Sequence, residues 1–100
     1  MARLKIDREA ERMMLERELE QHGFDHLHVR VHGTNLIIYL LDDGEPVNRA
    51  RLTKVTVQYY TLSMADYRGR WEATLYRGTL DEIVRLLTEQ FGFALAPWPS

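Results

Sequence analysis

The stretch "DHLHVRVHGTNLIIYLL", residues 25–41, constrains the fold more than any other part of the chain. Apolar and polar residues alternate in its first half, which is the period of a strand with one buried face. Gly33 and Thr34 then form a short hairpin connection to a second strand. Pairing His32 with Asn35 places six aliphatic side chains on one face, and a one-residue slip would bury the histidines. The six are Leu27, Val29, Val31, Leu36, Ile38 and Leu40.

Two further segments are expected to add strands to this hairpin. Asp43-Gly44 predicts a turn, and Pro46 argues against a central strand in "DDGEPVNRA". Alternation resumes in "RLTKVTVQYYTL", residues 51–62, and again in "RWEATLYR", residues 70–77. The side chains expected to point inward are Val55, Val57 and Tyr59 in the first segment, and Trp71, Ala73 and Leu75 in the second.

The segment "IDREAERMMLERELEQHG" predicts a first helix, with Asp7 as its N-cap and Gly23 as its stop. Its apolar residues lie on two nearly opposite sides. Ile6, Ala10, Met13 and Met14 form one side, and Leu15 and Leu19 form the other. Such a helix either lies between two layers or offers one side to a partner. The alternative is one wide core stripe with an exposed Leu or Met.

A second helix is predicted near the C-terminus. Thr79 and Glu82 match a capping box, in which each side chain satisfies a free backbone N–H. Apolar residues then recur at helical spacing until Gly92. The sequence therefore predicts an α+β fold of order αββββα, with a mostly antiparallel four-stranded sheet and both helices on one face. Residues 1–96 are expected to form one domain, and residues 97–100 a short Pro-containing tail.

The composition excludes several classes of function. The 100 residues include no cysteine, so disulfides, thiolate metal sites and cysteine nucleophiles are ruled out. The charged start and the lack of an apolar run of about 20 residues favour a cytoplasmic chain outside the membrane. Neither serine, Ser63 or Ser100, lies in a nucleophile elbow, and the six glycines form no phosphate loop. We therefore expect a non-enzymatic protein without a cofactor.

The histidines of the first strand raise the question of a metal. Side chains at i and i+2 of a strand point the same way, so His26 and His28 could share a zinc or nickel ion, with His22 or His32 as a third ligand. A structural zinc site needs four ligands, and only His26 and His28 are certain to share a face. A strand face alone fixes no ligand geometry, so a solvated or interfacial face is the favoured explanation and no metal is expected.

The outer face of the sheet is the main candidate for function. Aromatic and aliphatic side chains there would be uncovered in a monomer, and a two-fold dimer is the commonest way to cover such a face. The first hypothesis is therefore a protein-interaction or assembly module, homodimeric through this face or through the first helix. Its interface candidates are Ile37, Tyr39, Leu41, Tyr60 and Tyr76.

The alternative is single-stranded nucleic acid bound on the same face. Aromatic rings interleaved with cations can stack bases and contact phosphates. The formal net charge of −2 argues against a strongly basic nucleic-acid binder, although a local basic patch stays possible. The candidates for this function are Arg30, Lys54, Gln58, Tyr60, Arg70 and Tyr76.

Overall fold

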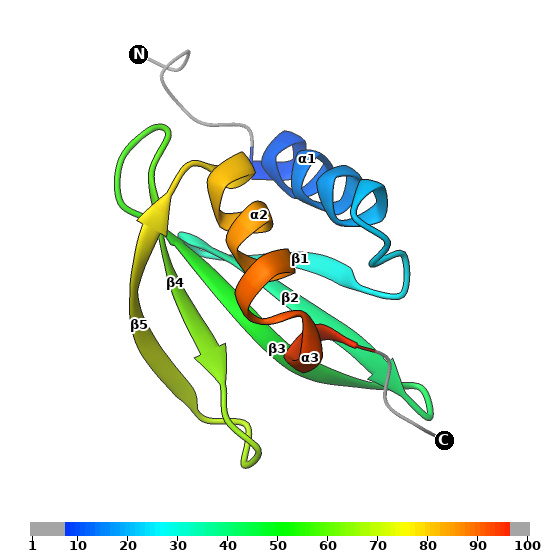
Figure 1. Cartoon of the computed structure of the whole chain (residues 1–100). Coiled ribbons are helices and arrows are strands. Elements are labelled where there is room, and N and C mark those ends of the chain that lie inside the picture. Colours follow the sequence, from blue (N-terminus) through cyan, green and yellow to red (C-terminus); the bar gives the residue numbers. More distant parts are fainter. Residues whose placement is uncertain (1–7, 97–100) are drawn as a thin grey trace.

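The computed structural model describes residues 8–96, which form an antiparallel five-stranded sheet with its helices on one face (Figure 1). The strands follow one another across the sheet in chain order, from β1 to β5. The α+β class is confirmed, but the sheet has five strands where four were predicted. In chain order the elements are α1 (Arg8–Gln21), β1 (His28–His32), β2 (Asn35–Asp42), β3 (Glu45–Lys54), β4 (Tyr60–Ala65), β5 (Trp71–Gly78), α2 (Leu80–Gln90) and α3 (Gly92–Leu95).

The β1–β2 hairpin has the register that the alternation predicts. His32 pairs with Asn35, and Val29 pairs with Ile38. The left-handed backbone of Gly33, with φ of 61°, closes the two-residue turn. The strand begins only at His28, because residues before it turn back from α1, with the N–H of Leu27 donating to the carbonyl of Phe24. In β1 the odd positions therefore face the helices, and the even positions from His28 onward face the opposite side of the sheet.

The expectation that Pro46 excludes a central strand is wrong. Pro46 lies in β3, the middle strand, directly after the turn at Asp43 and Gly44. It pairs with Leu41 next to the hydrogen-bonded Asp42–Glu45 pair, so its nitrogen points away from β2. The other neighbour, β4, reaches only as far as Ala50. Pro46 is thus on a locally unpaired edge, where a missing N–H removes no ladder bond.

The segment 51–62 is not one strand but the end of β3, a loop and the start of β4. The loop, residues 55–59, closes with the N–H of Val55 donating to the carbonyl of Tyr59. Val55, Val57 and Tyr59, predicted to point inward, are at least half exposed. Tyr60, Leu62 and Met64 are buried instead. Residues 55–59 include β-branched residues and contain no Gly or Pro, so the sequence pattern does not indicate a loop there.

The inward face predicted for β5 is also wrong. Trp71 pairs with Ala65 and lies on the open face, and Leu75 is 99% exposed. The register of β5 against β4 shifts between Thr61 and Ser63, so that extra residues bulge from β5. Successive side chains of a strand point to opposite faces of the sheet. A one-residue error in the predicted position of β4 therefore reverses the faces assigned to the residues of β4 and β5.

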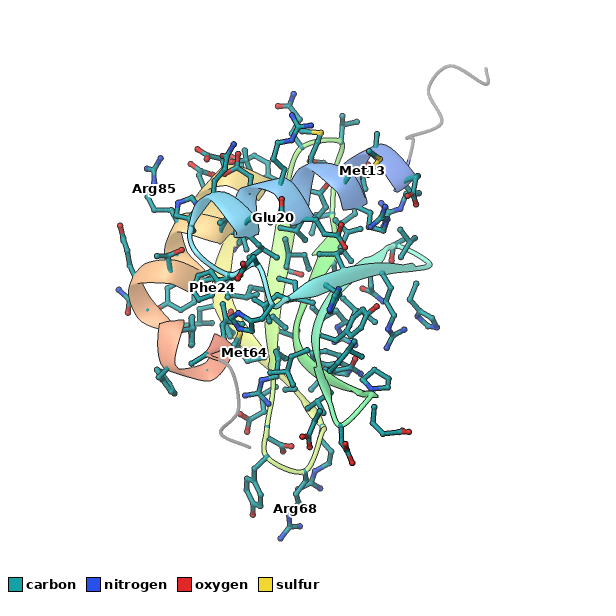
Figure 2. All side chains as sticks on the ribbon, turned by 90° about the vertical axis from the view of Figure 1, so that its right-hand side faces the viewer. Met13, Glu20, Phe24, Met64, Arg68 and Arg85 are labelled. Carbon is teal, nitrogen blue, oxygen red and sulfur yellow. The ribbon has the colours of Figure 1, made fainter. Side chains whose placement is uncertain are left out.

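The helices close the core over one face of the sheet. Leu15 and Leu19 of α1 are fully buried, whereas Met13 and Met14 are more than half exposed, so α1 uses one of its two apolar sides within the described residues. Figure 2 shows Met13 on the outer side of α1, and Phe24 and Met64 between the helices and the sheet. The Thr79–Glu82 capping box is formed as predicted. The Asp7 cap and the tail 97–100 lie outside the described residues.

Among residues 8–96, no helix is long and apolar enough to cross a membrane.

Candidate functional site

The sheet face opposite the helices, here called the open face, has an unusual charge pattern. From the register, its outward strand positions include two arginines at its centre and no Asp or Glu in the part of the chain that the structure describes. By contrast, α1 carries five acidic and three basic residues, and α2 carries three and one. The acidic excess of the chain therefore lies in the helical layer, and the open face is locally basic.

The centre of the open face is a row of side chains that crosses the strands. Arg30 of β1 pairs with Ile37 of β2, which pairs with Arg51 of β3. Neighbouring strands are about 4.8 Å apart, so the two arginines start roughly 10 Å from each other. Ile37 between them is only 5% exposed although no described helix covers it. A shallow hollow of about 240 Å³ opens here, lined by Arg30, His32, Asn35, Ile37, Asn48, Arg51 and Trp71.

Arg30 is held by neutral partners. Its Nη2 donates to Oδ1 of Asn48 at 3.1 Å, and its guanidinium lies 6.0 Å from the centre of the Tyr39 ring. Tyr39 in turn packs against the imidazole of His28, with ring centres 5.4 Å apart. These contacts orient the guanidinium without neutralising its charge.

Arg51 is likewise held by contacts with uncharged groups. Its guanidinium lies 4.8 Å from the centre of the Trp71 ring, a cation–π distance. Its Nη2 reaches Oγ of Ser63 only at 3.5 Å, and its Nε is buried without a hydrogen-bond partner within residues 8–96. Stacking on Trp71 therefore positions this cation more than hydrogen bonding does.

Several cations elsewhere in the described chain are paired with carboxylates. Lys54 contacts Glu11, Arg70 contacts Asp66, and Arg85 contacts Asp81, all within 4 Å. The described contacts of Arg30 and Arg51 are with an amide, a hydroxyl and aromatic rings. The centre of the open face thus presents two positive charges that no described carboxylate compensates.

The predicted interface residues do not all lie together. Ile37, Tyr39 and Leu41 share the open face, with Leu41 half exposed at its far end. Tyr60 is on the helix-covered face and is 2% exposed. Tyr76 lies in the β5 bulge with its ring against Phe91, ring centres 5.9 Å apart. Placing Tyr60 and Tyr76 on the outer face was wrong, for the register reason given above.

The nucleic-acid candidates are also dispersed. Arg30 alone is on the open face. Lys54 points to the helix side, where it bonds Glu11, and Gln58 lies in the loop between β3 and β4. Arg70 precedes β5 and pairs with Asp66 across its own loop. Any ligand of the open face would meet a different set of residues from the predicted one.

His26 and His28 do not converge. Nε2 of His26 lies 2.6 Å from the carbonyl oxygen of Leu95, so it donates there, in the helical layer. His28 packs on Tyr39 on the open face. Within residues 8–96, no three side chains of the types that bind metals come together. The two histidines separate because the strand begins at His28, so the alternation does not extend back to His26.

A second polar cluster lies under α1. The carboxylate of Glu11, buried at 8% exposure, accepts from the Tyr60 hydroxyl at 2.7 Å and from Nζ of Lys54 at 3.0 Å. Arg8 donates to it as well, at 3.1 Å. Burial, and then the hydrogen bond to Glu11, raise the pKa of Tyr60 far above its ordinary value. Every charge here has an opposite partner, which suits a structural tie between α1 and the sheet.

Sequence reasoning missed Arg51, Asn48 and Trp71. The alternation places Arg51 at the start of a single long strand and points Trp71 inward together with Ala73 and Leu75. If Pro46 does not stop the strand, the turn at Asp43-Gly44 sets the first pairs of "NRARLT" with β2, but this register alone places Arg51 opposite Leu36. Only the bulge of β3 after Asn48 moves Arg51 opposite Ile37 and onto the open face. Trp71 offered no signal either, because its face depends on the β4 register.

Comparisons with protein-family models, with curated proteins and with solved structures found no match for this chain.

Proposed function

We propose that the chain is a non-enzymatic binding protein whose open face takes single-stranded nucleic acid. The observation that carries the proposal is the pair Arg30 and Arg51, two cations with neutral partners on a face whose outward strand positions have no described carboxylate. Arginine donors suit phosphate groups, and flat rings beside them suit unpaired bases. An open antiparallel sheet is a known way to present both.

The same charges disfavour the homodimer through this face. If two copies met face to face, the uncompensated arginines of each would approach those of the other. Like charges across an interface weaken association by as much as several kcal/mol. Moreover, Ile37 is already covered within one chain, so the apolar stripe Ile37, Tyr39, Leu41 offers less area than the sequence suggested. Charge and area together favour an anionic ligand over a second copy.

The test is a titration of a labelled oligonucleotide, about ten nucleotides long, at several salt concentrations. The double variant R30Q/R51Q should bind about tenfold more weakly or worse, because hydrogen bonds between charged groups contribute about 1.5–3 kcal/mol each. The slope of log affinity against log salt should become shallower by about 0.7 for each of the two arginines that contacts a phosphate of the single strand.

The matched control is R17Q/R85Q, which removes the same charge from α1 and α2 in the helical layer. Arg85 lies on the far side of the molecule from the open face (Figure 2). This control should bind with the affinity and the salt-dependence slope of the wild type, apart from a small long-range electrostatic effect. Equal weakening by both double variants would show that only net charge matters and would remove the open face as the site. A wild-type dimer in light scattering that Tyr39→Glu dissociates would favour self-association through this face instead.

A further inference from the structure

The hollow over Ile37 has the size and chemistry of a site for one flat ring. Its volume of about 240 Å³ is below the roughly 300–1,000 Å³ of pockets for drug-sized ligands. The apolar side chain of Ile37 lies among its lining residues, and Trp71 and the guanidinium of Arg51 add flat surfaces. An aromatic heterocycle, which has apolar faces and polar edges, matches this arrangement.

The polar lining of the hollow is rich in donors. The carbonyl oxygen of the Asn48 side chain is already used by Arg30, and that of Asn35 accepts from Thr53 at 2.6 Å. What these asparagines have left are mainly amide N–H groups. The guanidinium groups add only donors. Such a rim matches the carbonyl and ring-nitrogen acceptors on the edge of a nucleobase.

We propose that this hollow holds one unpaired base of a bound single strand, stacked against the Arg51–Trp71 pair, with the adjacent phosphate on Arg30. The inference rests on the proposed function and specifies which part of the ligand the site recognises. Guanidinium planes and aromatic rings both stack on bases in single-strand recognition. A base inside a duplex has both faces covered by its neighbours, so a duplex would present only its backbone to the arginines.

The experiment compares three probes on the full chain carrying Trp98→Phe, which leaves Trp71 as the single tryptophan of the sequence. The probes are an oligodeoxythymidine of about ten nucleotides, an abasic phosphodiester of the same length, and a blunt-ended duplex without unpaired bases. Affinity is measured by anisotropy at low salt, and base stacking by the emission of Trp71. The oligodeoxythymidine should bind about 5- to 100-fold more tightly than the abasic strand, and it alone should change Trp71 emission.

Equal affinity for the oligodeoxythymidine and the abasic strand, with Trp71 emission unchanged, would overturn the base site while leaving phosphate binding by the arginines intact. Failure of every probe to bind at low salt would overturn the proposed function as well. The variant W71A should lower the affinity for oligodeoxythymidine to that for the abasic strand. Because the abasic comparison uses protein with Trp71 in place, the test survives if W71A fails to fold.

Discussion

The two faces of the sheet use charged side chains in opposite ways. On the helix-covered face, Lys54 and Glu11 meet under α1 at 3.0 Å, and the Tyr60 hydroxyl completes the cluster. On the open face, Arg30 and Arg51 rest on rings and neutral polar groups. A buried charge must be paired to be tolerated, whereas an uncompensated charge is tolerated only near water or a ligand. The difference indicates that the charges of the covered face tie α1 to the sheet, whereas those of the open face have no carboxylate partner among the described residues.

The largest effect should come from the core of the covered face. Ile38 is fully buried, so Ile38→Ala should lower the free energy of unfolding by about 2–5 kcal/mol through lost burial and a residual cavity. Leu41→Ala, at the half-exposed end of the open face on the same strand, should change it by less than about 0.5 kcal/mol. Urea denaturation of both variants checks this contrast, and equal losses would show that the open face is packed as tightly as the covered one.

A smaller loss in the free energy of unfolding is expected when the buried ion pair between Glu11 and Lys54 is broken. Glu11→Gln keeps the shape of the side chain but leaves Lys54 and Arg8 without their shared counter-charge. Because the pair is about one tenth exposed, we expect a loss of about 2–3 kcal/mol, somewhat below the value for a fully buried pair. Glu20→Gln, at an exposed position of the same helix, serves as the control in the same unfolding assay. Oligonucleotide affinity of the folded Glu11→Gln protein should be unchanged.

Tyr60 gives the covered face a pH dependence. Its pKa is raised in the folded protein, so the unfolded chain releases the phenolic proton first. Stability from this group is therefore complete below about pH 10 and declines as the pH rises above that value. Tyr60→Phe should cost about 1–2 kcal/mol at neutral pH and should reduce the alkaline decline. Unfolding curves at a series of pH values test this, with Tyr76→Phe as the control. If the stability of Tyr60→Phe declines at alkaline pH as much as that of the wild type, other groups cause the decline.

The smallest effect on stability is expected on the open face. Among residues 8–96, Nε of Arg51 has no hydrogen-bond partner and the described contacts of Arg30 are with neutral groups, so R30Q/R51Q should change the free energy of unfolding by less than about 1 kcal/mol. Thermal or urea unfolding of this variant, beside its oligonucleotide affinity, separates the two roles. A loss of several kcal/mol would mean that the arginines serve the fold, and the contrast between the faces would fail.

Local signals in the sequence were sufficient for part of the fold. The β1–β2 register, the turn at Asp43-Gly44 and the capping box at Thr79 each depend on residues within a few positions of one another. The same local reasoning misjudged residues 51–62, since β-branched residues continue through the loop without a Gly or Pro. Of the predicted site, Arg30, Ile37 and Tyr39 lie on the open face because they belong to the well-specified hairpin.

What the sequence determined by itself is therefore the α+β class, the first hairpin and the helices that cover one face, because periodicity and capping are local properties. Which face Tyr60 and Trp71 occupy was decided only by the tertiary structure. The alternation of β5 favours the wrong face, because Trp71, Ala73 and Leu75 share one parity, and the start of β4 is hidden by the loop that precedes it. The position of the β3–β4 loop and the bulges on β3 and β5 select the observed faces. That selection brings Arg51 next to Trp71 and creates the hollow on which the proposed function depends.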